Sequence, residues 1–358
     1  MSESIASIDQ PGPVTSTRRR WRRVLLWTIG TIGAIVIASI VVINLTPWPG
    51  AMLIRYVFES GASDVKAAME KHTPQGVASI IDEQYRPGDD DAFLDVYFPE
   101  TADAAGVQLP TLIWTHGGAW ISGHKDDAAP YFQLIANEGY SVISLGYSIA
   151  PEHDYPLPIL QVNDALAYIG QNADRFHVDM DRIVMAGDSA GAQITSQIAA
   201  IITNPAYAAD MDVTPSLGPD QLRGVILFCG IFDMKTFMDQ ASLASGFLQW
   251  GTKTAVWAYT GTRDTDSTAL QQMSTINFVT VSFPPTFISG GNADPLTDHQ
   301  SRPLASKLDE LGVETTGIFY ADDHEPKLAH EYQFNLDNAD GQAALQGLLE
   351  FLQEHTSS

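Results

Sequence analysis

The stretch Val184-Met-Ala-Gly-Asp-Ser-Ala-Gly-Ala-Gln193 places one hydroxyl, that of Ser189, between Gly187 and Gly191. A strand that turns at once into a helix crowds its own backbone, so small residues on either side relieve the clash and the turn residue is pushed outward. Residues 182–186 read as a short buried strand, and isoleucines follow at helical spacing (Ile194, Ile198, Ile201, Ile202). This context indicates an exposed nucleophile. Taken alone, G-x-S-x-G fits a small-residue turn packed on a sheet equally well.

Composition and charge exclude several classes of protein. The chain has 358 residues, of which 45% are hydrophobic, so it is long enough to bury a large core and is not disordered. Residues 1–50 contain five arginines against Glu3 and Asp9, which gives them a formal charge of +3. Residues 51–358 therefore carry −27, and the whole chain carries −24. So acidic a body repels phosphates, and we expect no nucleic-acid partner. We expect this charge to form a solvated acidic face that keeps the protein soluble; a specific cation-binding role is the alternative.

Residues 24–43 are uncharged and follow directly after the five arginines (Arg18, Arg19, Arg20, Arg22, Arg23). A helix of this length spans a bilayer core of roughly 30 Å. A secretory signal is the alternative, but its apolar core is usually about 7–15 residues long and ends in a small-residue cleavage site. We therefore expect a cytoplasmic basic tail at 1–23 and a single-pass membrane anchor at 24–43. Because arginine-rich flanks stay in the cytoplasm, everything after Trp48 is expected outside it.

Apolar runs alternate with helical patterns along the rest of the chain. Strands are expected at 93–98, 111–115, 141–146, 182–186, 225–229, 286–289 and 316–320, and helices around 131–138, 159–171, 190–203, 299–311 and 342–353. This alternation predicts an α/β fold with a largely parallel sheet covered by helices on both faces. Cys229, the one cysteine, lies in an apolar run, so we expect a buried core thiol rather than a nucleophile.

Two stretches fit the alternation poorly, residues 50–85 and residues 232–283. Segments inserted after the strands of such a sheet commonly cover the ligand crevice at the carboxyl ends of the strands. We interpret 50–85 as a possible N-terminal cap and 232–283 as a possible cap insertion in a domain of 86–358. Ordinary packing is the simpler interpretation of both.

Ester hydrolysis by a serine also needs a base, a carboxylate that orients the base, and donors for the oxyanion. After the strand at 111–115 comes His116-Gly-Gly-Ala-Trp120, where adjacent glycines let backbone N–H groups approach a substrate oxygen. We predict an oxyanion hole formed by the N–H groups of Gly117, Gly118 and Ala190. A plain Gly-Gly turn is the alternative, and His116 is expected to brace the loop.

Three motifs occur in order: His116-Gly-Gly-Ala-Trp120, Tyr147-Ser-Ile-Ala-Pro-Glu-His153 and Gly187-Asp-Ser-Ala-Gly191. Together they resemble the hormone-sensitive-lipase-like esterases of the α/β-hydrolase fold, from about residue 90 to the C-terminus. The Ala-Trp pair, where that family usually has a further glycine, is closer to feruloyl-esterase-like (BD-FAE-like) and kynurenine-formamidase-like relatives. The resemblance implies a mostly parallel sheet flanked by helices, a partly helical cap, and serine hydrolysis of small carboxylic esters with no cofactor and no metal.

The orienting carboxylate is expected at Asp294. It follows the strand at 286–289 in Gly290-Gly-Asn-Ala-Asp-Pro-Leu296, where a turn can aim it into the crevice, and it resembles the family's Asp-Pro-Leu aspartate. An ordinary turn aspartate is the alternative. Asp298 is expected to begin the next helix as its N-cap. The chain order of this fold, serine, acid, histidine, puts the base downstream.

Two histidines, His324 and His330, lie 30 and 36 residues after Asp294. His324 is flanked by three acidic residues, which favour the protonated form, and a protonated base is idle. His330 precedes the final helix at the place where the resembled family has His-Gly-Phe, although Glu331 stands where that family has glycine. We therefore predict His330 as the base and His324 as a loop residue.

These residues predict a membrane-anchored serine esterase in which Ser189, His330 and Asp294 cleave small or short-chain acyl esters. A cap over the site is expected to limit the acyl group. An amidase or formamidase acting through the same groups is the alternative within enzymes. A catalytically silent, membrane-anchored binding protein on the same fold is the alternative outside them.

Overall fold

The structure, a computed structural model, describes residues 16–357. The chain divides into two units, Met1–Pro49 and Gly50–Ser358. The strands are β1 Val77–Gln84, β2 Phe93–Pro99, β3 Leu109–Thr115, β4 Ser141–Leu145, β5 Val178–Asp188, β6 Leu222–Phe228, β7 Thr286–Gly290 and β8 Thr315–Phe319. The helices are α1 Ser16–Leu45, α2 Trp48–Met69, α3 Glu100–Ala105, α4 Ala129–Asn137, α5 Leu157–Gln171, α6 Ala190–Thr203, α7 Pro205–Asp210, α8 Met234–Leu243, α9 Gly246–Thr260, α10 Thr268–Met273, α11 Arg302–Leu311 and α12 Ala339–Thr356. Short helical turns are η1 Glu70–His72, η2 Pro219–Gln221, η3 Thr275–Asn277, η4 Thr297–Ser301 and η5 Tyr332–Phe334.

The strands form one sheet in the order β1-β2-β4-β3-β5-β6-β7-β8. Pairing is antiparallel from β1 to β2 and from β2 to β4, and parallel from β4 through β8. The predicted α/β class and the seven predicted strands are confirmed, with their ends moved by a few residues. Parallel strands end at the same edge, so the loops after β3, β5, β7 and β8 meet there.

Two apolar cores cover the two faces of the sheet. Along β3, Ile113 points into one core, whereas Leu112 and Trp114 point into the other. This is the period of two that a strand imposes. Helices α5, α6 and α11 pack on the first face, and α4 and α12 pack on the second. Strands buried on both faces explain why the sequence shows continuous apolar runs.

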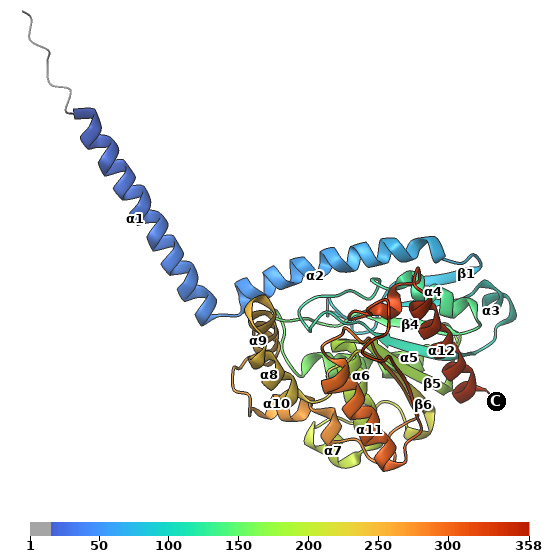
Figure 1. The fold of residues 1–358 in the computed structure, drawn as a ribbon. Helices are drawn as coiled ribbons and strands as arrows, with labels where there is room; N and C mark the ends of the chain where they lie inside the picture. Colours follow the sequence, from blue (N-terminus) through green and yellow to red (C-terminus); the bar gives the residue numbers. More distant parts are fainter. Residues whose placement is uncertain (1–15, 358) are drawn as a thin grey trace, which may run out of the picture. The chain divides into compact units, whose positions relative to one another are not determined.

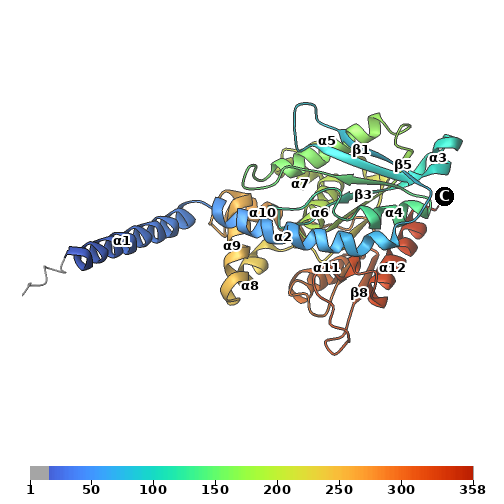
Figure 2. The ribbon, with the colours of Figure 1, turned by 90° about the horizontal axis from the view of Figure 1, so that it is seen from above.

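Residues 50–85 contain two different elements. Residues 77–84 form β1, which pairs with β2, so a cap that extends to residue 85 is wrong. Strand β1 lies at the edge of the sheet, has a register shift between Ile80 and Glu83, and contains no fully buried residue. Because its sequence therefore lacks a continuous apolar run, the sequence pattern did not predict it. The preceding helix α2 is stretched along one side of the body, from the α8 and α9 end toward α4 and α12 (Figures 1 and 2).

Residues 232–283 are helical, with α8, α9, α10 and η3 inserted between β6 and β7. The N-cap prediction for Asp298 is wrong. The chain turns helical before it, because the Thr297 N–H already bonds the Asp294 carbonyl at 3.2 Å. Asp298 lies inside η4, and its carboxylate pairs with Arg302 at 3.0 Å.

One helix among the described residues is long and apolar enough to cross a membrane, at Arg20–Leu45. This conclusion rests on length and composition alone, and a signal sequence near the N-terminus meets the same criteria. The helix contains the predicted span 24–43. Residues 1–15 of the predicted basic tail lie outside the described residues.

Candidate active site

Ser189 lies at the turn between β5 and α6. Its φ of 51° and ψ of −117° are unusual for a residue other than glycine, which is a sign of local strain. A Cβ on Gly187 would lie 2.5 Å from the backbone of Gly191, and a Cβ on Gly191 would lie 2.0 Å from the carbonyl oxygen of Thr115. Both positions therefore require glycine, and the sharp turn presents the serine at the carboxyl edge of the sheet.

Asp294 and His330 reach Ser189 from two other loops at the same edge. The His330 Nε2 lies 3.0 Å from the Ser189 Oγ, and its Nδ1 lies 3.0 Å from an oxygen of Asp294. The Asp294 side chain is fully buried, whereas that of His330 is 34% exposed. The imidazole thus bridges the hydroxyl and the carboxylate, with its Nδ1–H donated to Asp294 when Nε2 accepts from the serine.

His324 lies elsewhere. Its Nε2 is 3.1 Å from the carboxylate of Asp340, and its ring packs on Tyr320 with centroids 4.6 Å apart. The structure brings His330, and not His324, to the serine.

The environment of His330 favours its charged form. Removal from water lowers the pKa of His330, but the adjacent Cys229 sulfur and the hydrogen bond and negative charge of Asp294 raise it, and the pKa lies well above its ordinary value. Since a general base must be neutral to accept a proton, this shift bears on the pH at which the site works.

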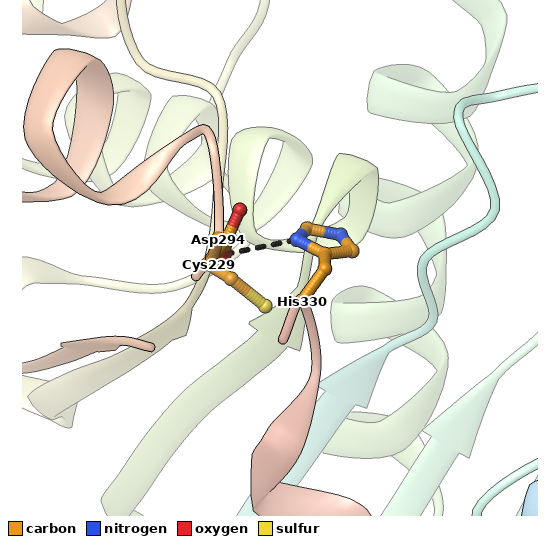
Figure 3. Close-up of side chains that lie close together, drawn as sticks. All are labelled: Cys229, Asp294 and His330. Atoms are coloured by element: carbon orange, nitrogen blue, oxygen red, sulfur yellow. Dashed lines mark hydrogen bonds and ion pairs between the residues drawn. The ribbon is translucent and has the colours of Figure 1, made fainter. Parts of the chain in front are cut away.

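Cys229 comes from the end of β6 and lies beside this pair (Figure 3). Its sulfur, a carboxylate oxygen of Asp294 and a ring nitrogen of His330 lie within 4.8 Å of one another, close enough to suggest metal ligands. Burial raises the pKa of the Cys229 thiol to about 11, so near neutral pH it is the neutral thiol. The buried core thiol that the sequence predicts matches this position. Because both ring nitrogens of His330 already have partners, we assign the group to the serine site rather than to a metal.

The loop 116–120 faces Ser189, and His116 holds it in shape. The His116 Nδ1 lies 2.8 Å from the Gly117 carbonyl, the ring stacks on Tyr147 at 4.2 Å, and the Tyr147 hydroxyl donates to the His116 carbonyl at 2.7 Å. Burial lowers the pKa of His116 to about 4, so the ring is neutral. Gly118 has a φ of +105°, and a Cβ there would lie 2.2 Å from the Ser122 carbonyl oxygen. The loop therefore requires glycine at 118.

Asp188, which the sequence did not single out, occupies part of the predicted oxyanion region. Burial raises the pKa of its carboxyl well above the ordinary value, while hydrogen bonds from the Trp114 indole, at 2.7 Å, and from the Gly117 N–H act in the opposite direction. An N–H directed at Asp188 argues against Gly117 as a donor to substrate. Within residues 16–357 no acceptor is found for the Gly118 N–H. Ala190 is the first residue of α6, where N–H groups have no acceptor within the helix.

A cavity of about 580 Å³ opens over Ser189 and His330. Its lining comes from the loop 116–124, from α9 and from one face of α2. Glu331 also borders it, with a carboxylate oxygen 3.7 Å from the His330 Nε2 and a left-handed φ of 60°. Glu331 stands where the resembled family has glycine, which the sequence already shows. The structure adds that its side chain lies beside His330.

Comparisons with known proteins were made on both sequence and structure. The BD-FAE family model matches residues 94–308. The chain is 27% identical over 249 residues to Esterase LipQ of Mycobacterium tuberculosis, a match that covers 68% of this chain and 56% of that protein. It therefore spans little more than half of this curated relative.

Solved structures share the fold. Esterase B from Lactobacillus rhamnosis superposes with a TM-score of 0.72 at 20% identity, covering 86% of this chain and 96% of that one. The esterase of Pyrobaculum calidifontis superposes with a TM-score of 0.65 at 21% identity, covering 85% and 93%. The sheet order, the turn at Ser189 and the extent of the family match thus agree, and this chain belongs to the BD-FAE family, with the α/β-hydrolase fold.

Proposed function

We propose that this protein is a serine carboxylesterase. The observation that carries the proposal is the position of His330, 3.0 Å from the Ser189 hydroxyl on one side and 3.0 Å from Asp294 on the other. Ser189 attacks the ester carbonyl while His330 takes its proton, and His330 then returns that proton to the leaving alcohol. A water molecule activated by the same histidine releases the acid. Asp294 orients the ring and stabilises its positive charge.

The developing negative charge needs donors that are already in place. We assign this role to the N–H groups of Gly118 and Ala190, on either side of Ser189. The Gly117 N–H, predicted from the sequence as a third donor, is engaged with Asp188. Ala119, which the sequence did not suggest, lines the cavity, so we take its N–H as the better third candidate.

The choice of ester over amide is supported by relatives rather than by geometry. LipQ and Esterase B are both named as esterases, and one structure of Esterase B was solved inhibited by a tributyrin phosphonate. The same three groups could cleave an amide. A silent binding protein would have no need of a strained serine bonded to a buried histidine–aspartate pair.

A preference for short acyl chains requires a cap that restricts the length of the acyl group in the pocket. A cavity of about 580 Å³ lies within the range of pockets that hold drug-sized ligands, roughly 300–1,000 Å³. Such a volume does not impose that limit. We therefore use short esters as reporters of the chemistry and leave chain length to a separate test.

The test uses the full-length protein in a non-ionic detergent. We expect Ser189-dependent hydrolysis of p-nitrophenyl butyrate and covalent labelling by a fluorophosphonate probe. Ser189→Ala removes the nucleophile while leaving binding intact, so turnover should fall by several orders of magnitude, up to roughly 10⁶-fold, and labelling should disappear. Labelling without turnover on any ester, but with turnover on aryl amides or formamides, would identify the amidase alternative. Equal turnover in the two proteins would rule out the assignment of Ser189.

We also propose that α1 is retained as a membrane anchor and that the hydrolase body lies outside the cytoplasm. Support comes from the length and hydropathy of Arg20–Leu45 and from the arginines that precede its apolar part. An uncharged apolar helix of this length matches a bilayer core of roughly 30 Å.

A further inference from the structure

Helix α2 forms a roof over the cavity. The residues with which it lines the cavity recur at helical spacing and share one face: Ile54, Val57, Phe58, Gly61, Ala62, Val65 and Met69. Only its ends are buried, at Gly50, Ala51, Ile54 and Met69. The apolar face between these ends therefore borders open space instead of a packed core.

Both ends of α2 are held against the body. At one end, the ideal Cβ position of Gly50 lies 2.7 Å from Thr254 of α9, and the Arg55 guanidinium donates to the Ile121 carbonyl at 2.6 Å and pairs with Glu152. At the other end, Lys66 pairs with Asp126 at 2.5 Å. The helix thus spans the cavity between two fixed points. Figures 1 and 2 show only its course along the body, from the α9 end toward α4 and α12.

The roofed space is long and apolar. From Ile54 to Met69 the roof measures roughly 22 Å at 1.5 Å per residue. Beneath it the lining includes aromatic and aliphatic side chains of the body, among them Phe132, Phe237 and Phe334, together with Ser189 and His330. A space of this kind suits extended hydrocarbon chains that carry the ester group at the serine.

Five large apolar residues line this cavity and are also exposed: Val57 (46% exposed), Phe58 (40%), Val65 (42%), Phe247 (54%) and Leu248 (57%). Val65 lies toward the Met69 end of α2. We take the other four, which come from α2 and α9, the helices that meet at Gly50 and Thr254, as the mouth of the cavity. Exposed apolar groups gathered around an apolar cavity mark a site for an apolar partner.

The covalent chain limits how far this mouth can lie from a bilayer. Gly50 begins the hydrolase unit, and the apolar helix α1 ends at Leu45. Five residues span at most about 18 Å even when fully extended, at 3.3–3.6 Å per residue. Whatever the orientation of the two units, an anchored α1 keeps the first turn of α2 within that distance of the membrane surface.

We propose that the substrate is a membrane lipid ester, which leaves the bilayer through the mouth formed by Val57, Phe58, Phe247 and Leu248 and lies with its hydrocarbon chains beneath α2. The proposal rests on the serine esterase function and adds the substrate class and its route. The reaction is ordinary hydrolysis, in which the lipid ester and water give a carboxylic acid and an alcohol. No further co-reactant is required.

The experiment uses full-length protein in vesicles of a dialkyl ether phosphatidylcholine, which contains no carboxylic ester. Dioleoylglycerol is placed either in the vesicles that hold the enzyme or in separate vesicles, and release of oleic acid is measured. We expect release to be at least about tenfold faster in the shared vesicles, because a two-chain lipid leaves a bilayer slowly through water. Hydrolysis of p-nitrophenyl butyrate in the same samples reports the chemistry.

Variants test the mouth. Phe247→Asp and Leu248→Asp should lower the ratio of dioleoylglycerol to butyrate hydrolysis by about tenfold or more, since a charge opposes entry of a hydrocarbon chain. Val281→Asp, at a 73% exposed valine that does not line the cavity, is the matched control and should leave the ratio unchanged.

The outcomes separate the two proposals. Ser189-dependent cleavage of butyrate without cleavage of dioleoylglycerol, or with equal rates from shared and separate vesicles, would overturn the lipid route and leave the esterase standing. An unchanged ratio in both mouth variants would overturn the route as well. Absence of cleavage of either ester would remove the esterase function and, with it, this inference.

Discussion

At the scale of single residues, the two histidines downstream of Asp294 differ in what they contact. His330 bridges Ser189 and Asp294, whereas His324 pairs with Asp340 at the start of α12. His330→Ala should therefore reduce butyrate hydrolysis by several orders of magnitude, up to roughly 10⁶-fold, because the serine loses its base. His324→Ala is the matched control and should keep most of the turnover. Steady-state kinetics on both variants, with thermal unfolding to verify the fold, makes the comparison, and the reverse result would move the base to His324.

The carboxylate of Asp294 is one of two groups, with Cys229, that raise the pKa of His330. Only the neutral ring accepts the serine proton, so kcat/KM should increase with pH through that raised pKa. Asp294→Asn removes the raising charge, so the acidic limb should move to lower pH. Turnover should also fall by roughly 10⁴-fold, because the ring loses its orientation. A pH–rate profile of p-nitrophenyl butyrate hydrolysis measures both effects, and an unmoved limb would show that Asp294 does not control the base.

At the scale of elements, the junction between β5 and α6 depends on backbone packing. A Cβ at Gly191 would lie 2.0 Å from the Thr115 carbonyl oxygen and 2.3 Å from that of His116, so α6 could not approach β3 as it does. Gly191→Ala should lower the free energy of unfolding by about 1–3 kcal/mol or more. Gly170→Ala in α5 is the control, since its Cβ would meet only the end of the Met180 side chain at 3.4 Å. Thermal unfolding midpoints should decrease for the first variant and stay level or increase for the second. Equal midpoints would contradict the steric argument.

At the scale of the whole molecule, we expect the arginines before the apolar part of α1 to determine the orientation of the protein in a membrane. With Arg18 to Arg23 retained in the cytoplasm, the hydrolase unit should be translocated. An alkaline-phosphatase fusion at the C-terminus should be active, and a reporter that works only in the cytoplasm should be silent. Carbonate extraction should leave the full-length protein in the membrane fraction. The opposite reporter pattern would reverse the topology, and release by carbonate would favour a cleaved signal.

A structural feature of this protein could be predicted from the sequence when the residues that cause it lie close together in the chain. The turn at Ser189 is determined by Gly187 and Gly191, which lie two residues away, and buried parallel strands show themselves as apolar runs. The weak edge strand β1 lacks such a run, and the apolar face of α2 is spread over residues 54–69, so neither element was recognised. A helical period can be read from sequence, but the sequence alone does not say whether that face meets a core or a cavity.

Ser189, Asp294 and His330 could be nominated because motif spacing and chain order are properties of the sequence. Two other features depended on the tertiary structure: the hydrogen bond from the Gly117 N–H to Asp188, and the roof that α2 places over the cavity. Each depends on groups far apart in the chain, such as Gly117 and Asp188, which are 71 positions apart. Such contacts form only when parallel strands bring their carboxyl ends to one edge of the sheet, where the loops that carry these groups meet.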